Sequence, residues 1–271
     1  MKQRYTVEDL EYLMSRLRDP ESGCPWDLKQ SFASIVPSTI EEAYEVAEAI
    51  EREDFEHLNE ELGDLLFQVI FYARLGSENG YFDFARIVDT LVRKLVRRHP
   101  HVFPSGDLHG DNQTADIDEQ QIKENWEAIK AAEREAKGED GTLGGVAVGL
   151  PGLTRALKLQ KRAAGVGFDW PDIGGVLDKI SEEVEELRAA IQAGDTEHAK
   201  EELGDLLFAC VNAARHLKAD PESALRQCNR KFERRFTFVE TRLKACDRLP
   251  TDASLQELDQ LWEAAKVEEK S

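Results

Sequence analysis

The feature that most constrains the fold of this chain is an internal repeat. Residues 41–75 and 182–216 align without a gap when they are offset by 141 positions, and they agree at 18 of 35 positions. Both stretches begin with paired glutamates, and both contain the sequence EELGDLLF. Because unrelated helical segments of this length would share only a handful of residues, we interpret the two stretches as copies of one duplicated unit.

The residues of each copy predict helices. Charged residues make up 33% of the chain, above the roughly 25% of an ordinary globular domain, and strong helix formers dominate the periodic segments. In the second copy, Gly194 supplies a helix stop and Asp195 an N-cap for the next helix. A short turn between two helices makes them antiparallel neighbours, so we expect an all-α fold with a helical bundle in each repeat. The apolar residues at helical spacing before this turn are Val176, Ile180, Val184, Leu187 and Ile191.

The helix after each turn carries a dense apolar stripe. We expect this stripe to face inward against the rest of its repeat. In the second copy it consists of Leu203, Leu206, Leu207 and Cys210, and in the first copy of Leu62, Leu65, Leu66 and Val69.

The domain boundary is predicted from a glycine-rich stretch. Residues 137–152 contain six glycines, a composition that disfavours a stable helix. We therefore expect an N-terminal helical domain over 1–136, a linker over 137–152 and a C-terminal domain over 153–271.

Charge, hydropathy and cysteine spacing limit the kinds of partner and the cellular compartment that we expect for this chain. The formal net charge is -19, whereas a duplex-binding protein needs a basic face, so nucleic acid is a poor candidate partner. The most apolar stretch, residues 65–75, is interrupted by Gln68 and is too short to span a bilayer. Residues 1–5 are polar and show no signal-peptide core. The widely spaced Cys24, Cys210, Cys228 and Cys246 suggest neither a zinc site nor a disulfide framework, so we expect thiols in the cytoplasm.

The repeat also contains a pattern of acids that predicts a metal site. Glu183 and Glu186 are three residues apart on one helix, as are Glu202 and Asp205 on the next, so each pair shares a helix face. The corresponding acids of the first copy are Glu42, Glu45, Glu61 and Asp64. Each close carboxylate pair in a partly buried site costs about 3–4 kcal/mol at an effective dielectric near 20, unless protons or a cation fill the site.

The ligand types decide which metal we expect. Four hard oxygen ligands favour Mg²⁺, which Mn²⁺ could replace, over zinc or copper. The Glu-x-x-His pair of a di-iron bundle is missing, which disfavours that alternative. A solvated acidic face is the other interpretation of such a pattern, but the same acids recur in both copies beside an apolar stripe while neighbours such as Tyr44 and Glu185 differ.

Basic and aromatic residues follow the acids in both copies. Lys231 and Arg235 are four residues apart, as are Trp262 and Lys266. Their counterparts in the first copy are Lys94, Arg98, Trp126 and Lys130. Cations beside a magnesium site suit a polyphosphate ligand, and an indole could stack a base or simply close the core. When Lys231 is aligned with Lys94, Asn229 falls opposite Val92, so the first copy lacks this amide.

The combined motifs resemble the MazG family of nucleoside triphosphate pyrophosphohydrolases. The resemblance is carried by EExxE followed after about 15 residues by EExGD, by LRDPESGCPWDLKQSF at 17–32 and by KLVRRHPHVF at 94–103. It implies an all-α NTP pyrophosphatase fold, usually a homodimer, and cleavage between the α and β phosphates by a metal-activated water.

The resemblance also implies roles for individual residues. Glu183, Glu186, Glu202 and Asp205 would hold Mg²⁺ in the C-terminal copy, and Lys231, Arg235, Trp262 and Lys266 would contact the nucleotide, with Asn229 as a further ligand. Glu182 or Glu201 could orient the attacking water, a hypothesis that rests on position alone. In similar proteins the C-terminal domain carries the activity, so we expect a regulatory or structural N-terminal half with a second acid site.

The sequence gives less information about which residues recognise the base. Arg162 and Trp170 precede the second acid helix, and an aromatic there could stack on a base or fill the core. We expect hydrolysis of ordinary or damaged NTPs and dNTPs to the monophosphate and pyrophosphate. A dUTP-preferring enzyme and a phosphoribosyl-ATP pyrophosphatase are alternatives with the same fold, and a non-catalytic module that binds metal or nucleotide is an alternative of another class.

Overall fold

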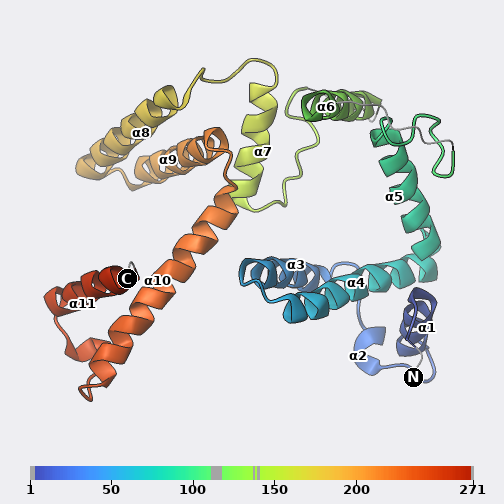
Figure 1. Ribbon diagram of the computed structural model, residues 1–271, viewed down its shortest axis with the longest axis horizontal. Coiled ribbons are helices and arrows are strands. Elements are labelled where there is room, and N and C mark those ends of the chain that lie inside the picture. Colours follow the sequence, from blue (N-terminus) through green and yellow to red (C-terminus); the bar gives the residue numbers. More distant parts are fainter. Residues whose placement is uncertain (1–3, 111–117, 137, 139–140, 270–271) are drawn as a thin grey trace. The chain divides into compact units, whose positions relative to one another are not determined.

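The computed structural model describes residues 4–110, 118–136, 138 and 141–269. Over these ranges every regular element is a helix and no strand occurs, which confirms the predicted all-α class (Figure 1). None of the helices within these ranges is both long and apolar enough to cross a membrane.

The chain divides into two compact units, residues 1–130 and 131–271. This division falls inside a helix, α6, and therefore before the glycine-rich stretch predicted as a linker. Residues 137, 139 and 140 of that stretch lie outside the described part of the chain, and its bounds stay a prediction.

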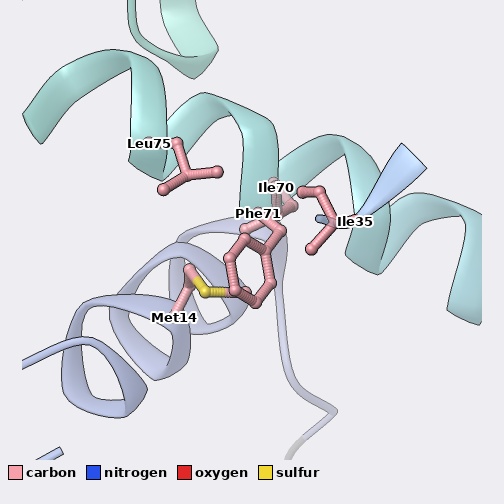
Figure 2. Close-up of a cluster of buried hydrophobic side chains, with 5 residues drawn as sticks. All are labelled: Met14, Ile35, Ile70, Phe71 and Leu75. Carbon is pink, nitrogen blue, oxygen red and sulfur yellow. The ribbon is translucent and has the colours of Figure 1, made fainter. Parts of the chain in front are cut away.

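The first unit is built on the hairpin of α3 and α4, and α1 packs against α4 (Figure 1). Its helices are α1 (Val7–Leu17), α2 (Pro25–Leu28), α3 (Val36–Glu51), α4 (Phe55–Glu78), α5 (Phe84–Arg98) and the first part of α6 (Glu119–Ala136). Its core consists of Met14, Ile35, Ile70, Phe71 and Leu75, all at most 3% exposed (Figure 2).

The second unit repeats this plan. The hairpin of α8 and α9 corresponds to that of α3 and α4, α7 packs against α9 as α1 packs against α4, and α11 packs along α10. The helices are α7 (Gly152–Ala164), α8 (Ile173–Ala193), α9 (Thr196–His216), α10 (Pro221–Lys244), the short 3₁₀ helix η1 (Pro250–Asp252) and α11 (Leu255–Glu268).

The turn between α8 and α9 has the predicted chemistry. Gly194 adopts a left-handed conformation with φ of 73°, which a residue without Cβ tolerates. The side chain of Asp195 accepts a hydrogen bond from the backbone N–H of His198 at 3.1 Å, as an N-cap should. In the first copy, Asp54 caps α4 in the same way, but Glu53 occupies the left-handed position with φ of 57°.

The expectation that the apolar stripe after each turn faces inward is wrong in part. Leu203 and Leu207 are 46% and 52% exposed, Cys210 is also exposed, and Leu62 of the first copy is 50% exposed. A two-helix hairpin covers only one side of each helix, so a wide stripe extends beyond the face that its neighbours can bury. The uncovered part leaves apolar surface available to another partner.

Candidate metal and nucleotide site

The acids of the second copy converge as the sequence predicts. Glu183 and Glu186 project from α8 and Glu202 from α9, and one carboxylate oxygen of each lies within 4.8 Å of the others. Glu183 and Glu202 are buried, whereas Glu186 is exposed. Asp205 is not in this group of three, but it and Glu183 both line the adjoining cavity. The antiparallel hairpin thus brings together acids that are about 20 residues apart in sequence.

The electrostatics of this cluster favour occupation by a cation. Burial raises the pKa of Glu202, and the carboxylates of Glu186 and Glu183 raise it further, while the nearby His198 opposes the shift. The ammonium of Lys179 lies 2.7 Å from an oxygen of Glu183 and 2.7 Å from one of Glu182. One carboxylate of the cluster, Glu183, is therefore already paired with a positive group. The donor set consists of the hard oxygens that Mg²⁺ and Mn²⁺ prefer.

A cavity of about 410 Å³ opens beside these acids, between α7, α8 and α9. This volume falls within the roughly 300–1,000 Å³ of small-molecule sites. The wall is largely apolar apart from its charged residues, which are Asp169, Lys179, Glu183, Asp205 and Arg215. Its aromatic residues are Phe168, Trp170 and Phe208. Trp170, predicted as a nucleotide contact, therefore borders the cavity that also borders the acid cluster.

Specific contacts hold Trp170 in this wall. The guanidinium of Arg215 on α9 forms hydrogen bonds with the neighbouring Asp169, one of them at 2.9 Å, and these bonds lower the pKa of the Asp169 carboxyl. A Cβ at Gly175 would lie 2.3 Å from Trp170 Cδ1, so only glycine lets the indole approach α8 this closely. The segment that carries Asp169 and Trp170 is thus held against α9 by Arg215 and against α8 at Gly175.

The predicted phosphate ligands form a separate group on α10 and α11. Trp262 packs on Phe232 with 5.2 Å between ring centroids, and the Arg235 guanidinium lies 5.7 Å from the Trp262 ring. Arg235 Nε also donates to Glu269 at 2.8 Å, and Lys266 Nζ lies 2.5 Å from Glu263. None of Asn229, Lys231, Arg235, Trp262 and Lys266 lines the cavity beside the acids. Their role as phosphate ligands stays a prediction.

The other predicted site residues surround the cluster. Glu182 pairs with Lys179, while Glu201 is exposed and has an oxygen 3.8 Å from His198 Nδ1. Arg162 lies near the end of α7 without lining the cavity, and its buried Nη1 has no hydrogen-bond partner among the described atoms.

The first copy keeps the acids but replaces the cavity wall. Glu42, Glu45 and Glu61 group as their counterparts do, and burial together with the charge of Asp64 raises the pKa of Glu42. The offset that aligns the copies pairs Asn212 with Phe71, and Val176 with Ile35. Figure 2 shows Phe71 between Met14 and Ile35 in the packed core of the first unit. A phenylalanine of the packed core thus occupies the position at which the cavity wall of the second copy has Asn212.

Sequence reasoning missed two residues of the site. Lys179 is four residues before Glu183, and this helical spacing could have indicated the ion pair. Asn212 lines the cavity as a buried amide, but its sequence neighbourhood carries no signal for this. Gln160, which precedes the second acid helix together with Arg162, is another buried amide of the cavity wall.

Comparison with known proteins shows which family the two copies belong to. The family model of the MazG nucleotide pyrophosphohydrolase domain matches residues 30–103 and 175–239, one segment in each copy. The chain is 47% identical over 265 residues to the nucleoside triphosphate pyrophosphohydrolase of Escherichia coli K12, covering 97% of this chain and 98% of that protein. It is 42% identical over 259 residues to the nucleoside triphosphate pyrophosphohydrolase/pyrophosphatase MazG of Thermotoga maritima, covering 96% and 95%. The uncharacterized Bacillus subtilis protein YabN is 43% identical over 259 residues, which are 95% of this chain and 51% of YabN.

Proposed function

Because this chain belongs to the MazG nucleotide pyrophosphohydrolase family, we propose that its second repeat is the site at which it hydrolyses nucleoside triphosphates to the monophosphate and pyrophosphate. The substrates would include both NTPs and dNTPs. The observation that carries the assignment to the second repeat is the cavity shared by Trp170, Glu183 and Asp205. In the first repeat the corresponding place holds Phe71, so that repeat would serve a structural or regulatory role.

The proposed metal is Mg²⁺, which Mn²⁺ could replace. Glu183, Glu186, Glu202 and Asp205 would hold it. Burial, together with the repulsion from Glu186 and Glu183, raises the pKa of Glu202, and a cation would relieve this unfavourable arrangement. When bound, the ion would neutralise charge on the phosphates and make a bound water more acidic. Mg²⁺ held by carboxylates keeps coordination positions for phosphate oxygens and water.

The protein's own residues would position the nucleotide and the water. The apolar cavity would hold the base, with Trp170 in its wall, and the adjacent acids would lie on the phosphate side. Lys179 would be able to pair with a phosphate once the metal binds its carboxylate partner Glu183. Either Glu182 or Glu201 would orient the attacking water, and Arg162 stays a candidate for a nucleotide contact.

A homodimer is part of the proposal. Leu203 and Leu207 of α9 and Phe232 of α10 are each about half exposed, and a second copy would bury them. Such an assembly could also supply the basic groups of α10 and α11 to a phosphate chain, namely Asn229, Lys231, Arg235, Trp262 and Lys266. A cytoplasmic location is supported by the four cysteines, which are free thiols in the structure.

The test is pyrophosphate release from eight NTPs and dNTPs with Mg²⁺. It compares the wild type with Glu202→Gln and with the matched control Glu61→Gln, which changes the corresponding acid of the first repeat. We expect the wild type to yield monophosphate and pyrophosphate, Glu202→Gln to lose at least about 100-fold in kcat, since one metal ligand is worth several kcal/mol, and Glu61→Gln to retain activity.

Other outcomes would change the assignment. Loss of activity in both variants would mean that the two repeats are coupled or that both are catalytic. If the folded, metal-loaded wild type released no pyrophosphate from any nucleotide, a binding module that regulates a partner would replace the hydrolase.

A further inference from the structure

Gln160 carries a buried hydrogen-bond acceptor that none of the described residues satisfies. Its side chain projects from α7 into the cavity wall and is only 7% exposed. Its Nε2 donates to the carbonyl oxygen of Phe208 on α9 at 2.8 Å, whereas its Oε1 has no hydrogen-bond partner among the described atoms.

The orientation of this amide is fixed. Turning it over would place its oxygen against the Phe208 carbonyl oxygen, and two acceptors cannot form a hydrogen bond with each other. The nitrogen must therefore face Phe208, which leaves Oε1 as the free group. A buried acceptor without a partner costs free energy, and an aliphatic side chain at this position would avoid that cost, so packing alone does not account for the glutamine.

The surroundings of Gln160 define the kind of group that would satisfy it. Phe168, Trp170 and Phe208 give the cavity flat aromatic walls, and Glu183 and Asp205 of the proposed metal site border the same space. A ligand that fits has apolar faces, an N–H donor at its edge and a negatively charged chain that reaches the metal. The base of a nucleoside triphosphate has all three features.

We infer that Gln160 is a specificity-determining residue, whose Oε1 accepts a hydrogen bond from an N–H group on the Watson–Crick edge of the bound base. The inference rests on the proposed hydrolase function of the second repeat. Two types of base group share this chemistry: the exocyclic amino group of adenine or cytosine, and the ring N–H of hypoxanthine or uracil. A base that lacks both would leave the buried acceptor unpaired when it displaces water from the cavity.

The experiment compares triphosphates that differ only at this edge. The purine set is ATP, ITP and purine riboside triphosphate, and the pyrimidine set is CTP, UTP and pyrimidin-2-one riboside triphosphate; the last member of each set has no N–H at the edge. Full-length wild type and Gln160→Met, which keeps the length of the side chain but cannot accept strongly, are assayed for kcat/KM on all six. For each enzyme, kcat/KM on one substrate is divided by kcat/KM on another. A difference between the enzymes in the fraction of active protein cancels in this ratio.

We expect the wild type to disfavour the members without N–H by about 10-fold or more, the value of one buried hydrogen bond. Gln160→Met should bring that ratio close to one by losing activity on the N–H-bearing substrates. If the wild type prefers ATP and CTP, the donor is the exocyclic amino group. If it prefers ITP and UTP, the donor is the ring N–H. An unchanged ratio in Gln160→Met, or a wild-type ratio near one, would overturn the inference while leaving the hydrolase assignment intact. A wild type that is inactive on all six but active on another NTP or dNTP would also overturn the inference alone, whereas inactivity on these six and on the eight NTPs and dNTPs would overturn the hydrolase assignment as well.

Discussion

The two copies share their acids but differ at other aligned positions. All four predicted metal ligands occur in both, yet Asn212 of the cavity wall corresponds to Phe71, which is 1% exposed in the first core. Lys179, which pairs with two acids, corresponds to Ser38. One copy therefore combines acids with an open cavity, and the other combines them with a packed interior.

This difference predicts the effect of exchanging one residue. Asn212→Phe should fill the cavity with the ring that the first copy carries, and it removes the acceptor of the 2.8 Å hydrogen bond from Arg215 Nε. We expect kcat/KM for nucleoside triphosphates to fall about 10- to 100-fold, mainly through KM, because the base loses roughly 1.5–3 kcal/mol of burial. Steady-state kinetics measures this, and Phe71→Leu is the matched control in the first copy. Unchanged KM in folded Asn212→Phe would show that the base binds elsewhere.

Among the elements, the turn of each hairpin sets how its two acid-bearing helices meet. Gly194 and Glu53 occupy the same left-handed position between the two helices, with φ of 73° and 57°. For a residue with a Cβ this conformation costs about 1–2 kcal/mol. The first hairpin therefore contains a strained residue that the second avoids, while Asp54 and Asp195 cap the following helices alike.

Opposite stability changes should follow from substitutions at these two positions. Glu53 is exposed, so Glu53→Gly loses no packing and should stabilise the first hairpin by up to about 1 kcal/mol. A Cβ at Gly194 would meet no atom of the described residues within 4 Å, so Gly194→Ala should cost about 1 kcal/mol through its conformation alone. Hydrogen–deuterium exchange of peptides from α3–α4 and α8–α9 measures the two hairpins separately. A loss of protection in Glu53→Gly would mean that this glutamate makes a stabilising contact.

At the scale of the whole molecule, the single chain leaves part of its apolar surface uncovered. The exposed stripe on α9 includes Leu203 and Leu207, and Leu225 and Phe232 on α10 are also half exposed. Surface of this kind on adjoining helices is typical of an interface between subunits. The proposed homodimer would bury it.

A substitution at Leu207, in the exposed stripe of α9, tests the proposed dimer. The wild type should have the molar mass of two chains by size-exclusion chromatography with light scattering. Leu207→Glu should shift it towards one chain at micromolar concentration, because a carboxylate would lose its water in the interface. Gln192→Glu, which adds the same charge at an exposed polar position of α8, should leave the dimer intact. A monomeric wild type, or a dimer unaffected by Leu207→Glu, would refute this interface.

The helices, the duplication and the acid cluster could all be predicted from the sequence, because each depends on local spacing. A period of 3.6 residues places Glu183 and Glu186 on one face, and Gly194–Asp195 reverses the chain so that Glu202 meets them. Repetition of the same spacing in a second copy made the pattern specific.

The cavity was decided by the tertiary structure. Its walls come from α7, the segment before α8, α8 itself and α9. Whether that space is open or filled depends on the volume of side chains far apart in sequence, such as Asn212 in this copy and Phe71 in the other. The free oxygen of Gln160 likewise follows from a contact with Phe208, 48 residues away. Spacing along a chain determines which residues share a helix face, whereas only packing between helices determines what space and which unpaired groups remain between them.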